Sequence, residues 1–248
     1  MDKVLLYFSL KYNGDWDKIY KALDAKEKIN YGDLENITNN IECNFLTILN
    51  SMYPLSLKSS YKPPFVLFYK GNLNLISKYN KTIAVIGGEN FNDYGYKATK
   101  KILSELKKEQ QIIMTYENNG LNEEILNHCR EDNLKNIFIL TTGIKNYLRK
   151  TSEMSNNDSL LVLSENYNVP IDDNKDHINR LISSFAKVVL FTQFSDHDML
   201  FDLINFLLSE GKEIFAFPSF DDQYNSTNQL IKMGAKLTES AKDIIFYS

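Results

Sequence analysis

Two turns that contain glycine have the composition of phosphate-binding loops. The first holds Gly87 and Gly88, which follow the apolar run Ile83 to Ile86 and precede Asn92 at the start of a helical pattern. Such a strand-to-helix turn exposes backbone N–H groups and the positive end of a helix dipole, which attract phosphate. The spacing lacks the full dinucleotide-binding pattern, so a tight turn with Asn92 as the helix cap is an open alternative.

The second turn holds Gly143, and basic side chains follow it. It comes after the apolar run 137–140, with Lys145, Arg149 and Lys150 close behind. Ligands of open α/β sheets bind beyond the carboxyl ends of the strands, so both turns are expected to face one crevice. The alternative for this second turn is a charged loop in solvent.

Two other features bear on anion binding. Asn179-Arg180 precedes an apolar pair on a predicted helix, where an arginine can bind a phosphate through two parallel hydrogen bonds or form a surface ion pair. Glu89 lies in the mouth of the first glycine turn. Its carboxylate is expected to repel an anion there.

Residues for metal or hydrolytic chemistry are dispersed. His128, His177 and His197 form no ligand pattern, and Cys43 and Cys129 lie in different segments. Neither a nucleophile elbow nor a P-loop sequence occurs. The sequence therefore predicts no catalytic residues, no metal site and no cofactor.

The composition is that of a globular protein. The chain has 248 residues, of which 43% are hydrophobic, and a formal net charge of −4. These values exclude wholesale disorder and argue against charge-driven coating of nucleic acid. The longest apolar runs are far below the roughly 20 residues that span a bilayer, and the N-terminus does not have the pattern of a secretory signal. We expect a cytoplasmic protein without a membrane partner.

The phosphate-binding turns need a scaffold, which the hydrophobic pattern indicates. Helical spacing runs from about residue 15 to Met52 and includes Ile41, Phe45 and Leu49. It ends near residue 53, and Pro63-Pro64 then extends the chain. We predict a small helical N-terminal domain over 1–52 and a second domain over 53–248.

Residues 53–248 alternate between short apolar runs and amphipathic stretches. Continuous hydrophobicity in the runs indicates strands covered on both faces, as in a parallel sheet. The predicted fold is therefore α/β, with an extended Rossmann-type, doubly wound, mostly parallel sheet. The predicted strands are 65–69, 83–86, 112–114, 137–140, 160–163, 188–191 and 214–217, and the predicted helices are 93–109, 120–131, 174–185 and 197–210.

Several segments in the same order resemble the DprA/Smf family of DNA-processing proteins. The most specific is Tyr53-Pro54 followed by the pattern PPxxLFYKGN, which begins at Pro63. The other segments that resemble the family are 83–88, Gly95, Leu163-Ser164-Glu165, 179–182, 210–218 and 228–236.

The resemblance implies a protein that binds single-stranded DNA, forms a homodimer through its C-terminal part, and hands the strand to the recombinase RecA during natural transformation. It implies no enzymatic activity. Transferred to this chain, the resemblance implies roles for two sets of residues. The expected phosphate track is Gly87, Gly88, Asn92, Gly143, Lys150, Asn179 and Arg180. The expected dimer residues are Leu230 and Ile231, for which burial in the core is the alternative.

The chain also departs from the family pattern. The family turn reads G-S-R where this chain has Gly87-Gly88-Glu89, so a cation is replaced by an anion. Ile178 stands where the family has its first R-N-R arginine. Two other functions therefore stay open: a degenerate homologue that acts only through protein contacts, and a nucleotide-binding enzyme similar to LOG phosphoribohydrolases, whose P-G-G-x-G-T motif is not found here.

Overall fold

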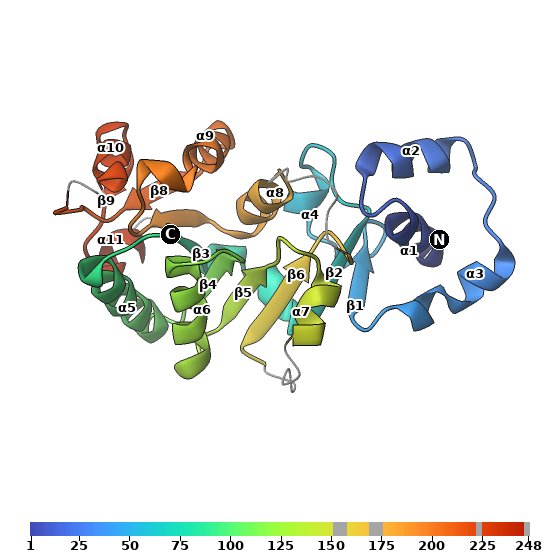
Figure 1. Ribbon diagram of the computed structural model, residues 1–248, viewed down its shortest axis with the longest axis horizontal. Helices are drawn as coiled ribbons and strands as arrows, with labels where there is room; N and C mark the ends of the chain where they lie inside the picture. Colours follow the sequence, from blue (N-terminus) through green and yellow to red (C-terminus); the bar gives the residue numbers. More distant parts are fainter. Residues whose placement is uncertain (151–157, 169–175, 222–224, 246–248) are drawn as a thin grey trace.

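The computed structural model describes residues 1–150, 158–168, 176–221 and 225–245. Figure 1 shows one sheet running along the molecule, with helices over both faces and the N-terminal helices gathered at one end. In the described part of the chain the sheet has nine strands in the order β1-β2-β6-β5-β4-β3-β7-β8-β9. The strands are β1 Asn44–Thr47, β2 Val66–Gly71, β3 Thr82–Ile86, β4 Ile112–Tyr116, β5 Asn136–Ile139, β6 Leu160–Ser164, β7 Val188–Phe191, β8 Glu213–Ala216 and β9 Lys236–Leu237.

The predicted fold class is confirmed. All seven predicted strands are present as β2 to β8. The strands from β3 to β9 pair in parallel, and the antiparallel pairs are β1 with β2 and β2 with β6. Strand β3 shows why the runs are continuously apolar: Ile83 and Val85 face one core, whereas Ala84 and Ile86 face the other.

Helices cover both faces of the sheet. One face packs against α5, α6, α7, α11 and the N-terminal α1, and the other against α4, α8, α9 and α10. The helices are α1 Asp2–Lys11, α2 Trp16–Asp24, α3 Tyr31–Asn36, α4 Leu55–Lys58, α5 Asp93–Lys108, α6 Leu121–Glu131, α7 Ile144–Lys150, α8 Asp176–Phe185, α9 Phe201–Ser209, α10 Ser226–Lys232 and α11 Ala241–Ile245. The short 3-10 turns are η1 Ile37–Asn40, η2 Leu73–Ser77, η3 Tyr79–Lys81 and η4 Asp196–Asp198.

The predicted helices agree with this arrangement, and one of them starts later than predicted. Helices α5 and α6 match 93–109 and 120–131 closely. The start predicted for 174–185 lies outside the described residues, and the rest is α8. In 197–210 the helix begins only at Phe201, after the separate turn η4.

The helical prediction over Ile41 to Leu49 was wrong. Asn44–Thr47 forms β1 at the edge of the main sheet, with Leu46 opposite Leu67 of β2. A short apolar run fits both the helical and the strand period of hydrophobicity. Antiparallel pairing with β2 favours the strand, because it satisfies the backbone hydrogen bonds and buries Leu46. A domain division at residue 53 stays a prediction.

Within the described residues, every helix is too short or too polar to cross a membrane.

Two leucines test the strand assignment of β1. Leu46 is 3% exposed and Leu49 is 57% exposed. We expect Leu46→Ala to lower the free energy of unfolding by about 2–5 kcal/mol and Leu49→Ala to change it by less than about 0.5 kcal/mol, measured by urea denaturation. In a helix these residues, three apart, would lie on one face, so equal losses would contradict the strand.

Candidate functional site at the carboxyl edge of the sheet

The order of the strands creates a crevice where β3 and β7 lie side by side. From β3 the chain proceeds to β4 on one side, and from β7 to β8 on the other. Ligands of doubly wound sheets bind beyond the carboxyl ends at such a reversal. The Gly87-Gly88 turn follows β3 here, and the Gly88 N–H donates to the Gln193 carbonyl after β7 at 2.8 Å. The sequence thus located the first turn at the expected crevice.

Close packing explains both glycines of the first turn. A Cβ on Gly87 would collide with Leu121, and a Cβ on Gly88 would collide with the carboxylate of Asp198. The Gly87 N–H donates to Oδ1 of the buried Asn122 at 2.9 Å. The N–H groups of both glycines are therefore bonded to the protein itself.

Asn92 caps α5, as the alternative for this turn predicted. Its Oδ1 accepts from the Gly95 N–H at 3.0 Å. Its own N–H donates to Oε1 of Gln193 at 3.0 Å, and its Nδ2 donates to Asp221 at 3.0 Å. The Asn92 side chain therefore links α5 to the loops after β7 and β8, and its amide group is hydrogen-bonded within the protein.

The Asp198 carboxylate lies in the first turn. Its Oδ1 accepts from the Glu89 N–H at 2.8 Å, and its Oδ2 accepts from the N–H and hydroxyl of Ser195 at 2.6 and 2.9 Å. The N–H that a bound phosphate would use at Glu89 is thus bonded to a carboxylate of the protein. Asp198 also forms a capping box with Ser195 at η4, and nothing in the local sequence indicates its contact with Glu89, 109 positions away.

A second carboxylate occupies the turn after β5. Glu117 accepts at 2.9 Å from both the Thr141 and Thr142 N–H groups, and at 2.8–3.0 Å from their hydroxyls. Gly143 adopts a φ of 84°, and a Cβ there would collide with the Asn168 carbonyl. In both turns, backbone N–H groups predicted to bind phosphate instead donate to the carboxylates of Asp198 and Glu117, which the sequence did not indicate as neighbours.

Groups at the rim remain open to a ligand. Lys150 ends α7 and is exposed, as is Arg149 beside it. Phe220 is 81% exposed and packs edge-to-face on Tyr94 with ring centroids 5.2 Å apart, while the Tyr94 hydroxyl donates to the Pro218 carbonyl at 3.1 Å. These cations and held aromatic rings suit the phosphates and bases of a single strand.

A buried phenol lies beneath the crevice. Burial raises the pKa of Tyr116 at the end of β4 to about 12, and the carboxylates of Asp198 and Glu89 act in the same direction. The phenol therefore stays protonated at neutral pH. It can donate a hydrogen bond but cannot act as a base.

Arg180 pairs with a carboxylate of the protein itself, and its assignment as a phosphate contact stays a prediction. Its guanidinium pairs with Glu165, just after β6, at 2.6 and 3.0 Å, and both side chains are largely buried. Burial disfavours the charged guanidinium, but Glu165 outweighs that and raises the pKa of Arg180. Asn179, half-buried, precedes it on α8. The ion pair connects α8 to the segment after β6, which supports a structural role for Arg180.

The predicted dimer residues are mostly inside the protein. Leu230 is 1% exposed and belongs to the core beneath α10, where the alternative prediction placed it, and Ile231 packs partly buried against the same core. Their helix faces the sheet, which explains the burial.

Among the residues that the structure describes, no cluster of three or more His, Cys, Asp or Glu side chains is arranged to hold a metal ion.

Comparison with known proteins identifies the family. Residues 44–247 match the family model of DNA recombination-mediator protein A. The chain belongs to this family. The sequence is 29% identical over 208 residues to the DNA processing protein DprA of Streptococcus pneumoniae, which covers 80% of this chain and 72% of that protein. It is also 29% identical over 211 residues to DprA of Bacillus subtilis, covering 81% and 70%.

Solved structures of DprA share the fold. The X-ray structure of DprA from Streptococcus pneumoniae is similar with a TM-score of 0.73 and 23% identity, over 99% of this chain and 97% of that one. A structure of DprA from Helicobacter pylori, described for its single-stranded DNA binding mode, is similar with a TM-score of 0.66 and 20% identity, over 83% and 96%. The family fold therefore extends over the whole sheet.

The buried ion pair yields a stability prediction. Glu165→Gln leaves the Arg180 charge without its partner, so we expect a loss of about 3–5 kcal/mol in the free energy of unfolding, measured by chemical denaturation. The control is Glu213→Gln, which breaks the exposed pair with Lys236 and is expected to cost less than about 1 kcal/mol. Equal small losses would contradict a structural role for Arg180.

Proposed function

We propose that this protein binds single-stranded DNA at the carboxyl edge of the sheet. The observation that carries the proposal is the match of residues 44–247 to the family of DNA recombination-mediator protein A. The Helicobacter pylori relative is described as binding single-stranded DNA, which supports the same ligand here. The reversal of strand order between β3 and β7 supplies a crevice at the place where such a fold holds ligands.

The proposed path of the strand runs over the two glycine turns. Two strand spacings separate the ends of β3 and β5, about 10 Å. In this proposal Lys150 and Arg149 contact phosphates beside Gly143, and Tyr94 and Phe220 stack with bases near Gly88 and Asn92. Stacking and phosphate contacts of this kind bind a strand without reading its sequence.

The internal carboxylates set the strength of this binding. Asp198 and Glu117 already accept from N–H groups of the turns, so fewer backbone donors remain for phosphate. Glu89 adds an exposed negative charge at the rim. We therefore propose that exposed cations and stacking supply most of the affinity.

The wider role that we propose follows the family. The protein acts in the cytoplasm, protects incoming DNA during natural transformation and loads RecA onto the strand. It does so as a homodimer formed through its C-terminal part. Met233 and Leu237 are 59% and 52% exposed there, next to the half-buried Ile231, and supply apolar area for a second copy.

A second candidate function is action through protein contacts alone. The observation in its favour is that Asp198 and Glu117 accept hydrogen bonds from N–H groups of the two turns, where a bound anion would otherwise accept them. Under this alternative the fold persists without strand binding. The relatives are named DNA processing proteins, which supports a binding role over a phosphoribohydrolase. Release of free base from a nucleoside monophosphate would contradict that choice.

Neutralising one rim cation tests the proposed path. Lys150→Gln removes a phosphate contact, so the dependence of log affinity on log salt should flatten by about 0.7 for a labelled poly-dT oligonucleotide. Fluorescence anisotropy at several salt concentrations measures this slope. Lys21→Gln, which neutralises an exposed lysine on α2, is the matched control and should leave the slope unchanged. Identical slopes for both variants would remove Lys150 from the path.

Restoring the family cation tests the first turn. Glu89→Arg replaces the exposed carboxylate with the residue type of the family G-S-R turn, so binding of single-stranded DNA should tighten and its salt dependence should steepen by about 0.7. The same anisotropy titration measures both effects. Asp132→Arg, which places the same charge change at the end of α6, controls for net charge. If both variants tighten binding alike, the effect is general attraction and the strand does not pass the first turn.

A further inference from the structure

We propose that a pocket over α8 binds a single nucleobase, as a free nucleoside or as one base of a strand. The pocket has a volume of about 300 Å³ and lies among α4, α8 and α9. None of its lining residues belongs to the glycine turns. The proposal is therefore independent of strand binding at the carboxyl edge.

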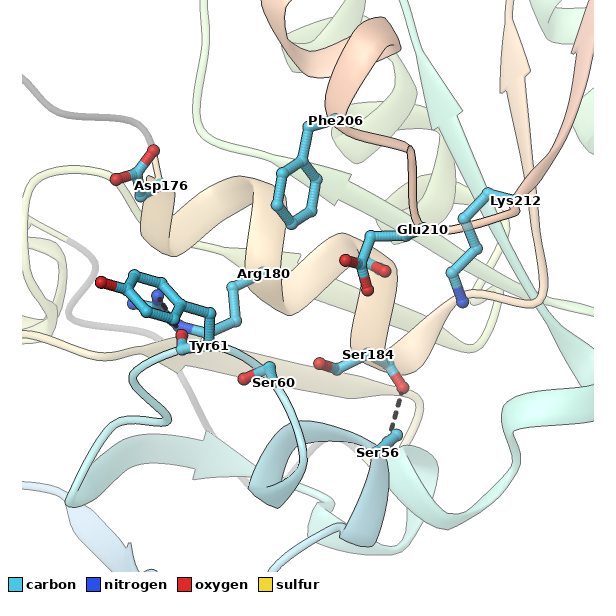
Figure 2. Close-up of a pocket in the computed structure, with 10 residues that line it drawn as sticks. Ser56, Ser60, Tyr61, Asp176, Arg180, Ser184, Phe206, Glu210 and Lys212 are labelled. Atoms are coloured by element: carbon cyan, nitrogen blue, oxygen red, sulfur yellow. Dashed lines mark hydrogen bonds between the residues drawn. The ribbon is translucent and has the colours of Figure 1, made fainter. Parts of the chain in front are cut away.

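Aromatic rings stand at two sides of this pocket. Figure 2 shows the Phe206 ring reaching down from α9 toward α8, while Tyr61 approaches from the opposite side in front of Arg180. The Arg180 Nη1 donates to the Tyr61 carbonyl at 3.3 Å, which holds that segment near α8. Ser56, in the first turn of α4, donates to the Ser184 carbonyl at 2.8 Å and fixes the lower wall. A flat ring can enter between these walls.

The polar groups distinguish among classes of ligand. Two cations, Arg180 and Lys212, and two carboxylates, Asp176 and Glu210, line the same space. Arg180 is already paired with Glu165, which leaves Lys212 beside two carboxylates, so the pocket does not favour a bare phosphate. The charged groups also disfavour a purely apolar ligand. A neutral ring with both donors and acceptors at its edge matches the lining.

A nucleobase has these properties. Its faces stack on aromatic rings, and its edge carries amino donors and carbonyl or ring-nitrogen acceptors. The exposed Glu210 carboxylate can accept from an exocyclic amine. The Lys212 ammonium has one N–H beyond its bonds to the Tyr79 hydroxyl and the Ala186 carbonyl, and the Ser56 and Ser60 hydroxyl oxygens can accept. The volume lies at the lower end of small-molecule sites, which suits one base with part of its sugar.

The test uses uncharged deoxynucleosides, because they lack the phosphate that the carboxyl edge would attract. Deoxyadenosine, deoxyguanosine, deoxycytidine and thymidine are titrated into the full-length protein by isothermal calorimetry. We expect saturable binding of at least one. Phe206→Ala and Glu210→Gln should each weaken it about tenfold. Leu208→Ala, an exposed residue on α9 outside the pocket, should leave it unchanged.

The outcomes separate this proposal from the proposed function. No nucleoside binding, or binding that is insensitive to Glu210→Gln, would overturn the pocket even if Phe206→Ala fails to fold, since Glu210 is exposed. Binding lost in Lys150→Gln instead would place the base at the carboxyl edge and would also overturn it. Competition by a poly-dT oligonucleotide for bound thymidine would identify a base of a strand as the occupant, and its absence a free nucleoside.

Discussion

Parallel pairing of β3 with β7 is the constraint on which the site depends. The register sets Ile86 beside Phe191, so the turn after each strand begins at the same edge of the sheet. Helices pack on both faces of these strands and bury every residue of them, which leaves the strand ends as the place where backbone donors meet solvent. The crevice therefore follows from the strand order rather than from any particular side chain.

Side chains then decide what the crevice can hold. In a fold of this kind the turns after β3 and β5 offer N–H groups to an anion. Here Asp198 and Glu117 accept those bonds, and Glu89 adds charge at the rim. The family supports the proposed binding of a DNA strand, whereas these carboxylates leave fewer backbone donors for its phosphates. Rim cations and exposed aromatic rings reconcile the two, because they act without the backbone donors.

The sequence predicted what depends on local pattern. Continuous apolar runs gave the seven strands β2 to β8, and the resemblance to the family was confirmed. Prediction from the sequence failed where contacts between distant segments determine the structure. Leu46 lies in a strand because β2 pairs with it, and Asp198 meets Glu89 across 109 positions. The sequence also does not show that Glu165 pairs with Arg180, because the two residues come from separate segments. The roles of the remaining site residues stay predictions.

Amide hydrogen exchange of the full-length protein, with and without a saturating poly-dT oligonucleotide, tests the central claim most directly. Proton exchange reports which backbone segments a ligand covers or stabilises. The account predicts slower exchange in 87–96 and 141–150, at the two turns and the ends of the helices that follow them. It predicts no change in α2, at the far end of the molecule (Figure 1). Protection confined to other segments, or no protection at saturation, would contradict strand binding at the carboxyl edge.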